Sequence, residues 1–363
     1  MTTPTSETLT QRRRILLLAT RRYATNVDDL WMFFSRSEHE VVGILEERSL
    51  RWTRWWRANR YLSIDGAAHG ARDHLWDPID FRHTRTQTYS NERTLRSRLD
   101  AIEFDYLAMG NGSGELQQAA VDHVGRERCL FTEYGWLPWP ANFYISRDGC
   151  GMRSEIASID ADAFGQVERR PSELSTLRDS FAYGRQPNLE PGRFIYVPLQ
   201  KDVDDFKFDF CRFDSNVEFI DFLTSVVPPD YTIAIKQHPL FVRTLPLERW
   251  ERVVEITADD LDKAWIYRSM AAMACINSTS ILEAILFGGT VFAFGEDLFL
   301  NKGLVHFDVR GADDFAARLH RRPDRERCDR FLSLLLERQI TRRRCIENDR
   351  DYIARHYWNR QLT

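Results

Sequence analysis

CINSTSILEAILFGG, residues 275–289, contains the pattern of a strand, a turn and a helix in immediate succession. The apolar residues before Asn277 predict a short buried strand. A helix expected over 280–287 is stopped by two glycines. A further apolar run over 290–294 predicts the next strand, so the segment is a βαβ unit, which requires a parallel sheet covered by helices.

The same alternation recurs along the rest of the chain. Short apolar runs typical of strands buried on both faces lie at 15–19, 102–109, 129–132, 194–198 and 232–235, and 41–45 fits a strand or a helix end. We therefore expect an α/β fold with two Rossmann-like αβα domains facing a central cleft. The expected boundaries are 12–192 for the N-terminal domain, 193–340 for the C-terminal domain and 341–363 for a C-terminal helical segment, with the hinge at the end of a proline-containing stretch.

Composition narrows the class of protein. A chain of 363 residues with 43% hydrophobic residues is long for one core, which favours two domains. The net charge of −4 gives no nucleic-acid signature. The six cysteines show no disulfide pattern and no C-x-x-C spacing, which favours the cytoplasm over an oxidising compartment. Cys129 and Cys275 lie in apolar runs and are predicted to be buried free thiols. No window reaches the ~20 apolar residues of a membrane span.

Two turns in the second half suit an anion. Asn277-Ser-Thr-Ser280 lies where a helix starts, and the first backbone N–H groups of a helix attract phosphate. The alternative is an ordinary capping box between Ser280 and Glu283, and both can hold together. Lys236-Gln-His238-Pro239 ends the strand before it, where a cation and an imidazole also suit phosphate. A structural histidine is the alternative there.

The acidic segment VPLQKDVDDFKFDF, residues 197–210, admits three interpretations. Asp202-Val-Asp204 could bind a metal, although this pattern arises easily in a chain with 54 acidic residues. All four acids could form a charged, solvated loop, and Asp202 and Asp209 are interpreted as solvated or structural in any case. The segment could also supply a catalytic carboxylate, since it follows a strand end.

Taken in order, these motifs resemble the bacterial capsule-synthesis and O-antigen β-Kdo glycosyltransferases. The resemblance spans roughly 128–305 and rests on five elements: Thr132-Glu-Tyr-Gly-Trp-Leu-Pro138 with Asp148-Gly149, Pro198-Leu-Gln200 with an acid four positions later, Lys236-x-His238-Pro239, the 276–295 run, and Asn301-Lys-Gly-Leu304. Gly289-Thr290-Val291 departs from the family's Gly-Lys-Pro-Val. The His-Pro and Ser/Thr motifs are also similar to those of bacterial sialyltransferases, which use CMP-sugars.

The resemblance implies a GT-B-like fold and a retaining transfer of β-Kdo from CMP-Kdo through a sugar–enzyme ester. The family spacing after Gln200 makes Asp204 the attacking carboxylate, with Asp205 as its rival. The residues that would contact CMP are Lys236, His238, Pro239, Asn277, Ser278, Thr279, Ser280 and Glu283. Glu133 would face the cleft from the acceptor side, and the base is Glu133, His238 or the departing phosphate. No metal or other cofactor is expected, because a single phosphate needs no divalent ion.

The expected partners are a CMP-sugar donor and a glycan or lipid-linked oligosaccharide acceptor, with no nucleic acid. Arginine clusters toward the two ends leave open peripheral association with the cytoplasmic face of the inner membrane or with other glycan-assembly enzymes. Two alternative functions stay open. One is a glycosyltransferase with a different donor, either CMP-sialic acid-like or a UDP-sugar. The other is a catalytically inactive glycan-binding module on the same fold.

Overall fold

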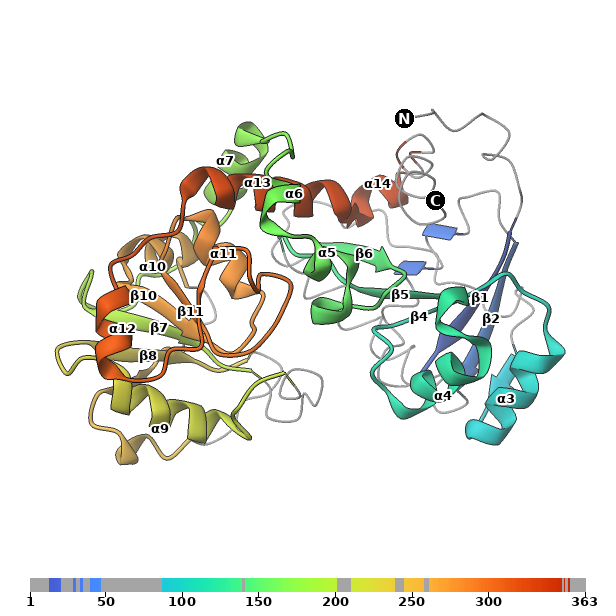
Figure 1. Ribbon diagram of the computed structural model, residues 1–363, viewed down its shortest axis with the longest axis horizontal. Coiled ribbons are helices and arrows are strands. Elements are labelled where there is room, and N and C mark those ends of the chain that lie inside the picture. Colours follow the sequence, from blue (N-terminus) through green and yellow to red (C-terminus); the bar gives the residue numbers. More distant parts are fainter. Residues whose placement is uncertain are drawn as a thin grey trace. The chain divides into compact units, whose positions relative to one another are not determined.

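The computed structural model describes residues 13–20, 29–30, 33–34, 40–46, 87–138, 141–200, 210–238, 245–257, 261–347, 349 and 352. They form two compact units, each built on one sheet. The first unit takes its described residues from 13–135, 141–155 and 339–352, and the second from 136–138 and 156–338. Figure 1 colours the chain in sequence order. The predicted α/β class is confirmed.

The first unit contains a seven-stranded sheet in the described residues, in the order β13-β6-β5-β4-β1-β2-β3. The strands are β1 (Arg14–Ala19), β2 (Glu40–Glu46), β3 (Gln87–Tyr89), β4 (Tyr106–Met109), β5 (Cys129–Tyr134), β6 (Asn142–Ser146) and β13 (Ile340–Thr341). β1 to β5 run parallel, and β6 pairs antiparallel with both neighbours. The other elements are α3 (Glu92–Ala101), α4 (Glu115–Val124), η2 (Arg126–Arg128), η3 (Gly151–Arg153) and α14 (Arg342–Ile346).

Local chemistry explains how these elements begin and how their core closes. Asn91 and Thr94 form a reciprocal capping box at the start of α3. On one face of the sheet, Leu17 and Ala108 belong to a buried cluster with Leu30, Phe33 and Phe34. Buried apolar area of this kind is the main term that stabilises such a layer.

The second unit contains a six-stranded sheet in the described residues, in the order β12-β11-β10-β7-β8-β9, and every pairing is parallel. The strands are β7 (Phe194–Pro198), β8 (Thr232–Lys236), β9 (Val253–Glu255), β10 (Ala272–Cys275), β11 (Val291–Ala293) and β12 (His306–Phe307). The helices are α5 (Glu155–Ser158), at the transition from the first unit, α6 (Ala161–Phe164), α7 (Pro171–Asp179), α9 (Asn216–Val226), η4 (Leu247–Arg249), α10 (Lys263–Ser269), α11 (Ser280–Leu286), α12 (Ala312–Arg318) and α13 (Arg325–Arg338).

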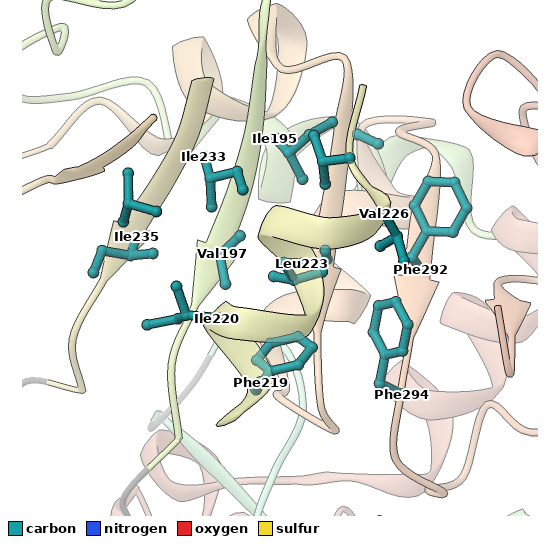
Figure 2. Packing of buried hydrophobic residues seen from close by; sticks show 14 of the residues in the cluster. Ile195, Val197, Phe219, Ile220, Leu223, Val226, Ile233, Ile235, Phe292 and Phe294 are labelled. Carbon is teal, nitrogen blue, oxygen red and sulfur yellow. The ribbon is translucent and has the colours of Figure 1, made fainter. Parts of the chain in front are cut away.

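Helices cover both faces of the second sheet, with α9 on one side and α10 and α11 on the other (Figure 1). Figure 2 shows how α9 packs: Phe219, Ile220 and Leu223 point toward the side chains of β7 and β8. Ile195 and Val197 of β7 face this helix, because alternate residues of a strand share one side. The strand's other side therefore faces α10 and α11, and Tyr196 meets Tyr267 of α10 edge to face.

The boundary between the units differs from the hinge predicted at residue 192. Residues 156–192 join the second unit, where Phe164 of α6 packs against Phe331 of α13 with ring centroids 5.6 Å apart. Arg170 N also donates to Ser333 Oγ at 3.0 Å. The chain returns to the first unit after α13, because β13 pairs with β6. The predicted C-terminal helical segment is therefore part of the first unit, where Arg342 of α14 forms a bidentate ion pair with Asp29 at 2.6 Å.

Two predicted elements are shorter than expected. The strand expected over 102–109 is β4 from Tyr106 only, since α3 continues to Ala101 and Asp105 accepts the Arg14 N–H at 2.8 Å. The sequence also predicts a helix over 262–273, but α10 ends at Ser269, because Met270 is extended and β10 starts at Ala272.

Candidate functional site

The carboxyl edge of the second sheet has the topology of a ligand-binding crevice. β7 is the first of these strands in the sequence and lies inside the sheet, with β8 on one side of it and β10 on the other. Open parallel sheets bind ligands outside the strand carboxyl ends where the strand order reverses in this way. In this unit the reversal lies between β7 and β10, so the residues that follow these two strands are the first candidates.

Gln200 follows β7, and the side chain of Asn216 holds its main chain through two hydrogen bonds. Gln200 N donates to Asn216 Oδ1 at 3.3 Å, and Asn216 Nδ2 donates to Gln200 O at 2.7 Å. The side chain is 8% exposed, and its Nε2 has no hydrogen-bond partner among the described residues. A buried donor without a partner costs stability, so this amide is available for a ligand or for an ordered water.

The Ser/Thr turn follows β10 as predicted, but its polar groups already have local roles. Ser278 Oγ accepts the Ser280 N–H at 3.2 Å and so caps the start of α11. Asn277 is buried, and its Nδ2 lies 3.5 Å from Glu296 O. Thr279 is exposed. The turn lies at the edge where the sequence placed it, whereas its contact with phosphate stays a prediction.

Glu283 does not form the capping box with Ser280 that the sequence analysis gave as the alternative to a phosphate site. Its carboxylate instead accepts Lys263 Nζ at 3.0 and 3.1 Å, and Tyr267 OH as well. Burial, followed by the charge of Glu283, raises the pKa of Tyr267 well above its usual value, so this hydroxyl keeps its proton and donates it. Glu283 thus joins α10 to α11, and its predicted contact with CMP is untested.

Lys236 and His238 lie at the end of β8, one strand away from the reversal. Lys236 is opposite Pro198 of β7, and its carbonyl accepts the Leu199 N–H at 2.9 Å. Between them, Gln237 Nε2 donates to Glu255 Oε1 at 2.7 Å. Both Lys236 and His238 are half-buried. Pro239 lies outside the described residues.

The acidic segment also falls outside the described residues, so Asp202, Asp204, Asp205 and Asp209 stay predictions. Its two flanks are described. Gln200 follows β7, and Phe210 O accepts the Glu296 N–H at 2.8 Å, just beyond β11. A β-bridge between Cys211 and Gly295 continues this contact. Both described flanks therefore lie at the carboxyl edge that carries Gln200 and Asn277.

Glycine at position 295 favours that contact. A Cβ there would lie 2.8 Å from Ile276 Cγ2 and 3.3 Å from Cys211 Cβ. A larger residue would have to displace these side chains for the two chain segments to approach so closely.

Glu133 occupies a comparable edge in the first unit. It lies near the end of β5, and Asn111 Nδ2, in the turn after β4, donates to its Oε2 at 3.1 Å. Sequence reasoning selected Glu133 but missed Asn111 as its partner. The signal was the Gly110-Asn-Gly-Ser-Gly114 run, which marks a special turn before a helix.

Three general expectations can be compared with the described residues. No disulfide joins any of the six cysteines, all of which are described, and burial raises the pKa of Cys129 to about 12, as expected of an inert thiol. Within the described ranges no group of three or more His, Cys, Asp or Glu could hold a metal ion. No helix in the described part of the chain is long and apolar enough to cross a membrane.

Solved structures with a similar arrangement define the fold as α/β and GT-B-like. The β-Kdo 2,7 transferase KpsC of Thermosulfurimonas dismutans aligns with a TM-score of 0.50 and 16% identity, over 75% of this chain and 92% of that one. The β-Kdo 2,4 transferase KpsC of the same organism aligns with a TM-score of 0.50 and 15% identity, over 89% of this chain and 90% of the other. At such identity the likeness concerns the fold.

A family model matches part of the sequence. Residues 184–343 match the model of the family described as capsule polysaccharide biosynthesis protein. The resemblance to capsule-synthesis proteins is therefore confirmed over this segment, which contains the whole second sheet. No curated protein matches the chain.

Proposed function

We propose that the chain is a retaining glycosyltransferase that moves β-Kdo from CMP-Kdo to a glycan acceptor in capsule or O-antigen synthesis. One observation carries the proposal. The second sheet places the Pro-Leu-Gln, Lys-x-His and Asn-Ser-Thr motifs together at one carboxyl edge, around its strand reversal. The family match over this segment and the fold that the chain shares with two β-Kdo transferases support a glycosyltransferase role.

In this proposal the second unit binds CMP. Lys236 and His238 supply the positive charge for its phosphate, and Pro239 ends the strand that carries them. Hydroxyls and N–H groups of the 277–280 turn add donors to the same oxygens. The leaving group, CMP, has a single phosphate. The positive charge and hydrogen-bond donors of these residues suffice to stabilise it, so no divalent ion takes part. Full activity in EDTA is the expected result, and loss of activity would revive the Asp202–Asp204 metal interpretation.

Chemistry proceeds by two displacements. A carboxylate oxygen of Asp204, or of its rival Asp205, attacks the anomeric carbon as the bond to the phosphate oxygen breaks, and CMP leaves with that electron pair. The acceptor oxygen then displaces the carboxylate from the opposite side, which restores the starting configuration. The acceptor proton passes to Glu133, to His238 or to phosphate.

The acceptor in this scheme is a glycan or a lipid-linked oligosaccharide. The site of the reaction is the cytoplasm, and an association with the inner membrane or with other assembly enzymes would bring the chain to a lipid-linked acceptor. A CMP-sialic acid-like or UDP-sugar donor, or binding without catalysis, are the competing outcomes.

Incubation with CMP-Kdo tests the proposal. The expected results are CMP release and a sugar adduct visible by intact-mass spectrometry. A thermal-shift series with CMP, UDP and GDP identifies the nucleotide, and CMP should stabilise the protein most. Stabilisation by UDP instead would overturn the donor assignment, and binding without any CMP release would favour the inactive module.

A further inference from the structure

The first sheet has a strand reversal of its own, between β1 and β4. β1 lies inside the sheet, with β2 on one side of it and β4 on the other. Leu18 of β1 is level with Met109 of β4, so Thr20 and Asn111, two residues further along each parallel strand, reach the same level. Open parallel sheets bind ligands outside the carboxyl ends of their strands at such a reversal. The residues that follow β1 and β4 are therefore a candidate binding edge within the first unit.

Helix α4 covers the face of the sheet to which Thr20 belongs. The opposite face is covered from the β1–β2 connection, since Leu17 of β1 shares a buried cluster with Phe33. The β1–β2 and β4–β5 connections cross the sheet in opposite directions, and right-handed crossovers of opposite direction lie on opposite faces. α4 therefore packs on the face of Leu18, and the alternation along a strand places the Thr20 side chain on that same face.

Two buried polar side chains at this edge lack partners. Thr20 is 6% exposed and Gln117 of α4 is 0% exposed, and neither Thr20 Oγ1 nor Gln117 Nε2 has a hydrogen-bond partner among the described residues. The Gly114 N–H, which can only donate, lies 3.5 Å from Gln117 Oε1, so the amide lies at the start of α4 with Nε2 beside it. A buried donor without a partner costs stability unless a ligand or a water accepts its hydrogen bond.

The start of α4 adds main-chain donors in a fixed position. Gly114 is the N-cap residue and has no side chain to cap the helix, whose first N–H groups have no partner within the helix. The turn before it is held in place. A Cβ at Gly112 would lie 2.7 Å from the Phe131 ring, and Gln118 donates to the Gly112 carbonyl. The donors of this edge therefore keep one arrangement.

The charges at this edge favour an uncharged ligand. Glu115 begins α4 and Glu133 lies near the end of β5, so two carboxylates are close to the turn. Residues 110–118 contain no lysine or arginine, and Arg342, beside β5, pairs with Asp29. Burying an anion without a paired cation costs far more than burying a neutral group that is hydrogen-bonded. The two unpartnered side chains therefore suit an oxygen atom that carries no charge.

We propose that Gln117 and Thr20 bind an uncharged sugar residue, with Gln117 Nε2 donating to a hydroxyl or amide carbonyl oxygen of the sugar and the Thr20 hydroxyl bonding a neighbouring hydroxyl. A sugar is the ligand class because the family model that matches this chain concerns polysaccharide biosynthesis. The inference rests on the proposed function in assigning this sugar to the glycan acceptor. The first unit would then select a neutral acceptor sugar over a sugar acid.

Titration of the whole chain with a matched pair of sugars, glucose and glucuronate, tests the inference. Glucose should shift the ¹⁵N signal of the Gln117 side-chain amide, which is identified by its loss in Gln117→Met, with a Kd on the order of millimolar. Glucuronate, which differs by one carboxylate, should bind on the order of 10-fold more weakly. Binding of N-acetylglucosamine more tightly than glucose would assign the amide carbonyl as the bound oxygen, and equal binding would assign a hydroxyl.

Two results of this titration would overturn the proposal. One is a Gln117 signal that neither neutral sugar shifts, as expected if the amide binds only an ordered water. The other is tighter binding of glucuronate than of glucose, which would make the site one for an anion.

Gln117→Glu separates loss of the donor from loss of the fold. The variant keeps the shape of the side chain and an acceptor for the Gly114 N–H, and an acid is favourable in the first turn of a helix. Saturation-transfer NMR should show glucose binding weakened about 3- to 10-fold, the loss expected for one hydrogen bond. Wild-type glucose affinity in Gln117→Glu would overturn the proposal.

Thr20→Val tests the second side chain. It should weaken glucose binding by about 2- to 5-fold, because it removes the hydroxyl and keeps the shape. Thr132→Val is the matched control, since Thr132 Oγ1 already donates to Tyr144 O at 2.8 Å, and it should leave glucose affinity unchanged. Wild-type affinity in Thr20→Val would overturn the assignment of Thr20.

The sugar titration uses no CMP-Kdo, so its failure and that of the proposed function are distinguishable. A chain that releases no CMP but shows the Gln117 shift would retain the sugar site and refute the transferase function. A chain that transfers β-Kdo while its Gln117 signal ignores neutral sugars would overturn this inference alone.

Discussion

The carboxyl edges of the two sheets carry opposite chemistry. In the first unit, the turn after β4 directs an amide N–H at the Glu133 carboxylate and satisfies its own polar groups through Ser113. In the second unit, Gln200 lies two residues after the end of β7, and its buried Nε2 has no partner among the described residues. The first edge presents a carboxylate that accepts hydrogen bonds, and the second presents a buried amide donor.

The difference shows that topology selects the place and loop composition selects the ligand. Both edges lie where parallel strands end, the position at which such sheets bind ligands. A glycine-rich turn in the first unit allows a close approach to β5, and the resulting site suits a neutral hydroxyl. Amide, hydroxyl and cationic groups in the second unit suit a phosphate.

Replacing Asp204 should have the largest effect. In Asp204→Asn or Asp204→Ala the attacking carboxylate is absent, so transfer should fall by roughly 10⁴-fold or more. CMP affinity should change little, and intact-mass spectra should lack the sugar adduct of the wild type. Asp202→Asn is the matched control in the same segment and should remain active. Full activity in Asp204→Ala would remove the nucleophile assignment, and loss only in Asp205→Ala would transfer it to Asp205.

Replacing His238 tests the donor character of the second edge. His238→Ala should weaken CMP binding by about 10- to 100-fold, because a hydrogen bond to a charged group contributes roughly 1.5–3 kcal/mol. Isothermal titration calorimetry with CMP measures the change, and Glu133→Gln in the other unit should leave the affinity as it is. Calorimetric binding that His238→Ala does not alter would refute the phosphate role.

Glu283→Gln separates a structural role from a ligand contact at the second edge. The substitution weakens the bonds to Lys263 and Tyr267, and it should lower the free energy of unfolding by about 1–2 kcal/mol. The value is modest because the Lys263 side chain is 36% exposed and therefore partly solvated. Urea unfolding and CMP calorimetry measure the two properties. Unchanged stability with weaker CMP binding would make Glu283 a ligand contact instead.

The smallest expected effect is that of Thr20→Val on the stability of the first unit. Thr20 follows β1, is 6% exposed, and its Oγ1 has no hydrogen-bond partner in the described part of the chain. Thr20→Val should therefore be neutral or stabilising by up to ~1 kcal/mol. Thr132→Val is the matched control, because Thr132 Oγ1 donates to Tyr144 O at 2.8 Å and its loss should cost ~1 kcal/mol. Equal losses in urea unfolding would mean that the Thr20 hydroxyl is bonded in solution.

Much of the fold was predictable because the signals are local. The apolar runs at 15–19, 194–198 and 232–235 coincide with β1, β7 and β8, since strands buried on both faces need continuous apolar residues. The sequence also predicts a helix over 217–226, and the structure contains it as α9, whose N-cap Ser215 accepts the Glu218 N–H. Short edge strands such as β9 and β13 were missed, because two or three residues carry no periodicity.

The positions of the candidate site residues at strand ends were predictable from the sequence, whereas their side-chain hydrogen bonds were less so. Motif order placed Lys236, His238 and the 277–280 turn at strand ends, and each is found there. The pairing of Glu283 with Lys263, over 20 residues of separation, could not be read from a capping pattern that Ser280-x-x-Glu283 also fits. Asn111 and Glu133 are 22 positions apart, and only the pairing of β4 with β5 brings them together.

By itself, the amino-acid sequence determined the α/β class, the strand–helix alternation and the order of the motifs, because apolar periodicity, helix caps and turn residues act over a few positions. Only the tertiary structure decided the order of strands in each sheet, the transfer of 156–192 to the second unit and the return of β13 to the first. These depend on pairing and packing between residues far apart in the chain, where many arrangements satisfy the same local pattern and the buried contacts select one.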